Sequence, residues 1–422
     1  MHTEQNDRVG REASASLLRN RPFGIYFLAW AVSKAGTQVG YIAIPLVAVL
    51  TLQASPIEAG LVGVAATVST LIMSLPAGVM ADRLHRRRLM IGAEFTRGAA
   101  LLYIAVAGWY GWLSISWMLV VVFVFGVATV LFDVSAQSFL PELVDRRFLV
   151  SANSKLASWE AGASVTGPAA GGALVQLVTA PATVLLTAFS HVASGLLLLR
   201  VRGDGRGPSA AKKESIFQQV RDGVTFVIAN SYLRVMVAMG TLLNFATYML
   251  IIIMPVVFRE YGLSSVELGF LLAAGGAGGL AGAATARRLV DVVGFGRALW
   301  MVGGIAGPAA FLVPFVSPGL MHLVASSAWF ILGYRVGLTN VLMVTLRQTV
   351  TPNRLLGRVT ASTRMLIVGS LSGGAALAGF IGEYAGLGAA LWLGATGVAI
   401  AAFPIYFSKL RTLREPPAAQ MD

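Results

Sequence analysis

Long apolar stretches separated by short polar segments run along the chain from Phe23 to Phe407. A helix needs ~20 apolar residues to cross ~30 Å of hydrocarbon. Backbone groups inside lipid must bond within their own segment, and we find no ~10-residue alternation of the kind that membrane β-strands show. The pattern therefore predicts twelve membrane-spanning helices, at residues 24–51, 57–81, 89–109, 116–140, 153–178, 182–201, 235–258, 266–286, 297–316, 320–346, 361–385 and 388–408.

The composition supports this pattern. Hydrophobic residues make up 56% of the 422 residues, charged residues only 12%, and the mean hydropathy is +0.74. With the N-terminus on the cytoplasmic side, nearly all of the 32 Lys and Arg residues fall in cytoplasmic segments, and Arg259 alone lies on the outer side. Positive charge gathers on the cytoplasmic side of membrane proteins. We therefore expect a multi-pass protein of a bacterial-type cytoplasmic (inner) membrane, with both termini cytoplasmic.

Several other classes of function find no support in the sequence. The net charge of +13 is spread over short loops beside apolar helices, which favours lipid headgroups over nucleic acid as the partner. The chain has no cysteine and only four scattered histidines, so we expect neither a metal site nor a cofactor. No nucleotide-binding loop and no nucleophile with a neighbouring base is found, which excludes an enzyme. Residues 1–22 are polar and predict no cleavable signal peptide.

The chain divides near its middle at a polar segment rich in Gly, Arg and Lys. Similar sequences after the fourth and tenth spans (Pro141 to Arg147 and Pro352 to Arg358) indicate a duplicated six-helix unit. The predicted fold is an all-α integral membrane protein of two pseudo-symmetric six-helix bundles. The expected segments are a cytoplasmic tail at 1–22, an N-terminal bundle at 23–201, a basic linker with an amphipathic helix at 202–233, a C-terminal bundle at 234–408 and a cytoplasmic tail at 409–422.

The loop after the second span carries a recognisable motif. Gly78, Asp82, Arg83, Arg86 and Arg87 resemble the Gly-x-x-x-Asp-Arg/Lys-x-Gly-Arg-Arg/Lys signature of the major facilitator superfamily, with histidine at the position of the second glycine. The resemblance implies the twelve-helix fold of that superfamily and secondary transport by alternating access. It also implies that Asp82 latches the outward-facing state against the N-terminus of the eleventh span, where unpaired N–H groups favour an anion. The alternative is a solvated basic loop.

The fifth span contains a second motif. Gly162, Gly167, Pro168, Gly171 and Gly172 resemble the end of the antiporter motif that marks exporters of the superfamily, although the first spacing is one residue too long. Small residues also let helices approach closely without any role in transport. Together with the repeated segments, this motif resembles the bacterial branch that exports drugs, macrolides and siderophores.

Charges inside the membrane are costly and usually serve a function. Lys34 lies ~18 Å into the first span, Asp133 ~12 Å into the fourth and Glu160 ~10 Å into the fifth, at ~1.5 Å per residue. For Asp133 we expect a gating pair with Arg87 or Arg83, or else a proton site. For Glu160 we expect proton coupling, because a low dielectric favours the neutral acid, or else a salt bridge with Lys34. Glu94 and Arg97 predict a local ion pair.

The first helices of the two halves are expected to line the substrate cavity, as the resemblance implies. Candidate residues are Lys34, Gln38, Tyr41, Asn244, Thr247 and Tyr248. Arg335 in the tenth span is expected to bind an anionic part of the substrate or to pair with an acid across the cavity. Lys34 and Arg335 together predict a preference for neutral or anionic amphiphiles over cations.

These features favour a monomeric, proton-coupled exporter of amphipathic small molecules, such as a drug, macrolide or natural product. The partners are then the substrate, protons and membrane lipids, with no nucleic acid. The alternatives are an importer of a small metabolite, or a lipid or siderophore transporter of the same fold. A non-transporting membrane sensor is a further alternative.

Overall fold

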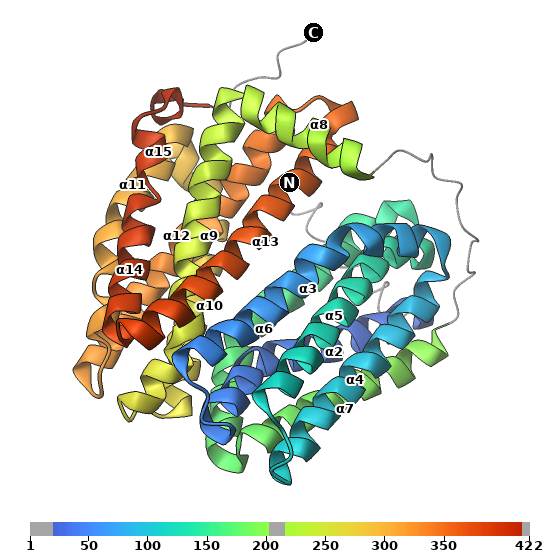
Figure 1. Cartoon of the computed structure of the whole chain (residues 1–422). Helices are drawn as coiled ribbons and strands as arrows, with labels where there is room; N and C mark the ends of the chain where they lie inside the picture. The colour runs from blue at the N-terminus through green and yellow to red at the C-terminus, as the bar shows by residue number, and fades with distance from the viewer. Residues whose placement is uncertain (1–19, 202–215, 416–422) are drawn as a thin grey trace, which may run out of the picture. The chain divides into compact units, whose positions relative to one another are not determined.

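The computed structural model describes residues 20–201 and 216–415. The expected tails and basic linker lie partly or wholly outside them. Every regular element of these residues is a helix (Figure 1). The elements are α2 (Arg21–Leu46), η1 (Val47–Thr51), α3 (Pro56–Arg83), α4 (Arg86–Trp109), α5 (Ile115–Leu143), η2 (Arg146–Phe148), α6 (Leu149–Val178), α7 (Ala180–Arg200), α8 (Ile216–Ala229), α9 (Ser231–Glu260), α10 (Ser265–Val293), α11 (Phe295–Ala310), η3 (Val313–Phe315), α12 (Leu320–Val350), α13 (Asn353–Tyr384), α14 (Leu387–Ile400), α15 (Phe403–Tyr406) and η4 (Lys409–Thr412).

Among the described residues, eleven helices are long and apolar enough to cross a membrane. The helical fold is thus confirmed, while the number of twelve spans is not. The difference is the expected span at 153–178. This segment lies within α6, a helix of 30 residues, which is not among those eleven. α6 carries Lys155, Trp159 and Glu160 in its first half.

Local sequence signals explain where the helices begin and end. Pro22 stands in the first turn of α2, where its missing N–H costs no hydrogen bond. Pro45 lies near the end of α2 and is followed by the wider π-helical turn η1. The Ser114 side chain accepts a hydrogen bond at the start of α5, and Ser264 forms a capping box with Glu267 at the start of α10.

The chain forms two compact units. Unit 1 consists of Met1–Val47 and Ile72–Lys212, and unit 2 consists of Ala48–Leu71 and Lys213–Asp422. Most of η1 and the first part of α3 therefore belong to unit 2. There the Arg259 side chain donates hydrogen bonds to the carbonyl oxygens of Val49 and Ala54, at 3.1 and 3.0 Å.

Unit 2 contains a very close helix pair. α10 and α12 pack through glycines, and a Cβ built at Gly278 would lie 2.0 Å from the Phe330 carbonyl oxygen. A Cβ at Gly333 would lie equally close to the Gly275 oxygen. Helix α8 packs on α13, where Arg358 donates to Asp222 at 2.7 Å.

Candidate functional site

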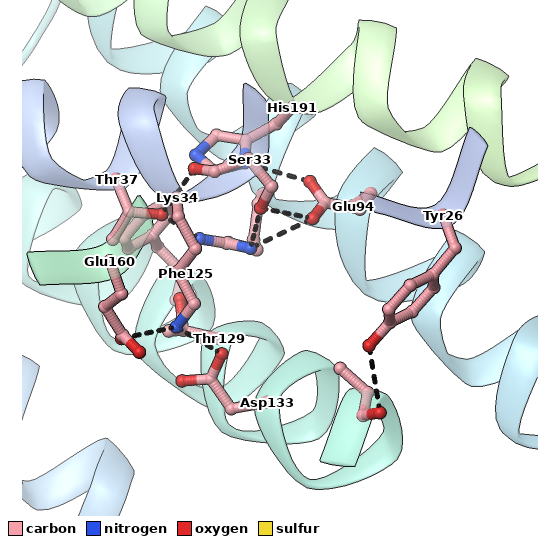
Figure 2. A network of polar contacts seen from close by, with 12 residues as sticks. Tyr26, Ser33, Lys34, Thr37, Glu94, Phe125, Thr129, Asp133, Glu160 and His191 are labelled. Atoms are coloured by element: carbon pink, nitrogen blue, oxygen red, sulfur yellow. Dashed lines mark hydrogen bonds and ion pairs between the residues drawn. The ribbon is translucent and has the colours of Figure 1, made fainter. Parts of the chain in front are cut away.

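The candidate functional site of unit 1 is built around Lys34, which lies in the middle of α2. Its Nζ atom lies 2.8 Å from a carboxylate oxygen of Asp133 on α5 and 3.6 Å from one of Glu160 on α6. Figure 2 shows both carboxylates directed at the lysine. The side chains are 14%, 32% and 51% exposed for Lys34, Asp133 and Glu160. We call these three residues the Lys34 cluster. One cation thus faces two carboxylates, so the ionised cluster has a surplus negative charge.

A second polar cluster lies beside the first, and its charged residues are completely buried. Glu94 and Arg97 of α4 form an ion pair at 3.1 Å, with side chains 0% and 1% exposed. The other Glu94 oxygen lies 2.9 Å from His191 Nδ1 on α7. On α2, Ser33 donates to Glu94 at 2.6 Å, and Arg97 donates to Thr37 (Figure 2). These five residues, the Glu94 cluster, tie α2, α4 and α7 together.

Aromatic side chains close the Glu94 cluster on another side. The Arg97 guanidinium lies 5.3 Å from the ring centres of both Phe125 and Phe132 on α5. Such contacts stabilise a desolvated cation by about 2 kcal/mol or more. The sequence indicated the Glu94–Arg97 pair but not its partners on α2 and α7. The signal that was available is a histidine in the middle of the apolar stretch 182–201.

The expected pairing of Asp133 with Arg87 or Arg83 is wrong for this structure, because Asp133 contacts Lys34 instead. The loop arginines find partners closer to the helix ends. Arg86 binds Glu142 and donates to the Ser138 carbonyl oxygen at 3.0 Å. Asp133 lies more than one helical turn deeper along α5 than Ser138, which places it beyond this contact.

The other motif residues lie at the end of α3 and the start of α4. Asp82 is half exposed and lies 3.9 Å from Arg86. Arg83 is exposed, and a Cβ added at Gly78 would meet no atom within 4 Å. His85, which replaces the second glycine of the signature, precedes α4 with φ −66° and ψ 110°. Because any residue adopts these angles, the turn does not require glycine.

Arg87 connects this loop to α7. Its side chain donates to the carbonyl oxygens of Leu198, at 3.0 Å, and Leu199. These carbonyls belong to the last turn of α7, where helical partners are missing and a cation is favoured. Arg87 therefore stabilises the end of a helix instead of pairing with an acid.

The glycine motif of α6 lies against α2. A Cβ at Gly167 would be 2.4 Å from Cβ of Gln38, and one at Gly171 would be 3.0 Å from the Val39 carbonyl oxygen. Pro168 and Gly172 are buried in the same stretch, while Gly162 is exposed and meets nothing. The small residues let α6 approach α2 closely, which places Glu160 near Lys34.

Arg335 differs from the expectation that it faces the substrate. Its side chain is buried in unit 2, with the residue 2% exposed, and donates to the Val398 carbonyl oxygen at 2.7 Å. Its second terminal nitrogen has no hydrogen-bond partner among the described residues. Val398 lies in the last turn of α14, so Arg335 caps a helix end.

The remaining cavity candidates lie on α2 and α9, each in its own unit. On α2, Gln38 contacts α6 and Tyr41 is 51% exposed. On α9, Asn244 donates to the Gly240 carbonyl oxygen of its own helix at 2.8 Å. Thr247 is half-buried, and Tyr248 packs against the small apolar cluster of Met249, Ile252, Ala375 and Ala378.

The chemistry available to these residues is ionic and proton-based. Among the described residues, no group of three or more His, Cys, Asp or Glu side chains could hold a metal ion. The Lys34 cluster, by contrast, brings two carboxylates to one amine in a membrane-spanning bundle. Charged groups inside a membrane-spanning bundle usually serve a function, and carboxylates can bind protons, so this cluster is a candidate for proton exchange.

The chain is similar to known transporters. Residues 12–421 match the major facilitator family described as transmembrane secretion effector. The multidrug efflux pump Tap of Mycobacterium tuberculosis is 28% identical over 425 residues, which cover 96% of each chain. Macrolide efflux protein A of Enterococcus faecalis is 23% identical over 185 residues, covering 44% of this chain and 57% of its own.

Among solved structures, a bacterial homologue of the iron transporter ferroportin superposes with a TM-score of 0.75 at 14% identity, covering 94% of this chain and 99% of its own. At that identity the match describes the fold. The family match extends over nearly the whole sequence. The chain therefore belongs to the transmembrane secretion effector family of major facilitator transporters and is a membrane transporter, not an enzyme.

Proposed function

We propose that this protein exports amphipathic small molecules across the cytoplasmic membrane in exchange for protons, by alternating access. The names of the multidrug and macrolide efflux proteins to which it is similar support export. The basic loops support an orientation with both termini in the cytoplasm. We further propose that the monomer is the working unit.

The observation that carries the proposal is the surplus carboxylate of the Lys34 cluster. Lys34 is 2.8 Å from Asp133 and 3.6 Å from Glu160, and Glu160 is the more exposed acid. In our proposal Glu160 takes up the proton, while Asp133 keeps its ion pair with Lys34. The cluster is then neutral with the proton bound and negative without it. A charge in low dielectric is costly, so the two forms favour different conformations.

The same charge count changes the expected substrate. The sequence predicted a preference against cations, on the basis of two unpaired intramembrane cations. However, Lys34 is paired with two acids and Arg335 is buried against α14. The deprotonated cluster is negative, so an amphipathic cation can replace the proton. The ring of the buried Trp30 lies 5.8 Å from Lys34 Nζ and adds an aromatic contact to the amine.

Transport in liposomes tests this proposal. Purified protein is reconstituted, a pH gradient is imposed, and the movement of ethidium is compared with that of a neutral amphiphile of similar size. Glu160→Gln should abolish gradient-driven ethidium transport and weaken ethidium exchange at equal pH, because the negative charge that the cation would balance is removed; exchange of the neutral amphiphile should remain. Glu260→Gln is a matched control, because Glu260 is 48% exposed and lies in unit 2. Wild-type rates for the control are expected.

Other outcomes separate the alternatives. If both Glu160→Gln and Asp133→Asn keep full gradient-driven transport, then other residues carry the proton or another ion drives transport. An importer would raise the cellular content of its nutrient, whereas an exporter lowers that of a lipophilic dye. A sensor that does not transport would show no flux for any compound in a broad panel.

A further inference from the structure

Unit 1 has a groove on its surface that the transport mechanism does not use. It lies between α4 and α5, which run side by side (Figure 1). Its volume is about 640 Å³. The wall is formed by apolar and small side chains of both helices, and Val124 is 39% exposed there. These wall residues are Leu89, Gly92, Phe123, Val124, Val127 and Leu131.

One end of the groove is basic. Arg83, His85 and Arg88 line it there, and all three are exposed. No acidic residue lines the groove. Within residues 20–201 and 216–415, neither Arg83 nor Arg88 has a carboxylate oxygen within 4.0 Å. The nearby acids Asp82 and Glu142 contact Arg86 instead. The groove end therefore offers two arginines without a counter-ion.

The length of the groove matches an acyl chain. From Arg88 to Thr96 the α4 side extends ~12 Å at ~1.5 Å per residue, comparable with half of the ~30 Å hydrocarbon core. A hydrophobic groove in a membrane-spanning unit, with cations at the end near the helix termini, has the charge and apolarity pattern of a phospholipid.

We propose that this groove binds one anionic diacyl phospholipid, whose phosphate lies between Arg83 and Arg88 and whose acyl chain lies along Leu89 to Thr96. Arginine suits phosphate because its planar fork donates two parallel hydrogen bonds. His85 supplies a further hydrogen-bond donor. A neutral headgroup gains less from this end, so the site selects phosphatidylglycerol over phosphatidylcholine.

Native mass spectrometry tests the proposal without any transport measurement. The full chain is extracted from bilayers of equal phosphatidylglycerol and phosphatidylcholine with matched acyl chains, and the ratio of the two retained lipids is measured. The wild type should retain phosphatidylglycerol preferentially. Arg83→Gln with Arg88→Gln should lower this preference by about fivefold for each arginine removed. The exposed pair Arg287→Gln with Arg288→Gln in unit 2 is the matched charge control and should leave the preference unchanged.

A second variant tests the apolar part of the groove. A Cβ at Gly92, which lines the groove, meets no atom within 4 Å, so Gly92→Leu adds apolar volume there and leaves every charge in place. It should remove the preference as completely as the arginine variant. Gly388→Leu, at an equally open position of α14, is its control. Thermal unfolding of each variant verifies that it is folded.

Each other result overturns the proposal. If Gly92→Leu keeps the preference while the arginine variant loses it, anionic lipid is attracted by the loop alone. If inorganic phosphate displaces the retained lipid, a free anion is the ligand. If the wild type retains both lipids equally, or is captured as a dimer that Gly92→Leu dissociates, the groove does not select an anionic lipid.

Discussion

The Glu94 cluster and the Lys34 cluster include adjacent residues of α2, but they differ in exposure. Ser33 belongs to the Glu94 cluster, in which Glu94 and Arg97 are at most 1% exposed. The next residue, Lys34, belongs to a cluster whose acids are 32% and 51% exposed. Burying a charge is expensive unless it is paired and hydrogen-bonded, and such a pair resists rearrangement. A partly exposed ion pair can exchange partners at little cost.

From this difference we infer that the Glu94 cluster stabilises the bundle, whereas the Lys34 cluster takes part in transport. In the Glu94 cluster, one carboxylate is matched by one guanidinium and accepts a further hydrogen bond from Ser33. In the Lys34 cluster, two carboxylates share one amine. We therefore expect substitutions in the first to lower stability and substitutions in the second to change transport.

The largest effect is expected for Glu94→Gln. The variant leaves the buried Arg97 without a counter-charge, which should lower the free energy of unfolding by about 3–5 kcal/mol. Unfolding by SDS, followed by the fluorescence of the eight tryptophans, measures this loss. Replacing both partners, in Glu94→Leu with Arg97→Met, should recover much of it. If Glu160→Gln destabilises the protein as much as Glu94→Gln, the proposed difference between the two clusters is wrong.

Lys34→Met should affect transport more than stability. Without the amine, the two acids repel each other and favour proton uptake at every stage of the cycle. A bias of ~1.4 kcal/mol changes an equilibrium tenfold, so gradient-driven transport should fall about tenfold or more. Because the acids are partly exposed, the unfolding free energy should change by only about 1 kcal/mol. Near-normal coupled transport by Lys34→Met would contradict the role of the cluster.

The helices were predictable because length and apolarity follow directly from the thickness of the membrane. Every expected span overlaps a helix, and prolines and serines give the ends, such as Pro22 and Ser264. The exception in apolarity is α6, whose polar first half carries Glu160. The charged and polar residues of this half thus weaken the apolar signal that identifies spans.

The site was predictable only in part. Counting residues along each span placed Lys34 ~18 Å and Glu160 ~10 Å from the cytoplasmic end, and the salt bridge considered between them is formed although these depths differ. The count does not say which faces of two helices meet, because rotation depends on packing. For that reason His191 and Ser33 were missed, and Asp133 was matched with loop arginines instead of Lys34.

Arg335→Met sharpens the comparison with a buried cation that has no acid partner within the described residues. Arg335 donates only to the end of α14, at Val398. Losing this cap should lower the unfolding free energy by at most about 2 kcal/mol, less than Glu94→Gln, since no opposite charge is stranded. The preference between ethidium and a neutral amphiphile should not change. A changed preference would restore Arg335 as a substrate-binding residue.

The smallest effect on stability is expected for Asp82→Asn, because this side chain is largely exposed to solvent. Asp82 is 52% exposed and its nearest cation, Arg86, is 3.9 Å away, so the unfolding free energy should change by less than ~1 kcal/mol. Arg86→Gln should lower the unfolding free energy more, because Arg86 also binds Glu142 and the Ser138 carbonyl.

If Asp82 latches the outward-facing state, as the family signature implies, Asp82→Asn should still reduce transport. It should also make a single cysteine placed on the outer side less accessible to thiol reagents, which is readily measured because the chain contains no other cysteine. Unaltered transport and labelling would assign Asp82 to the solvated surface of the loop.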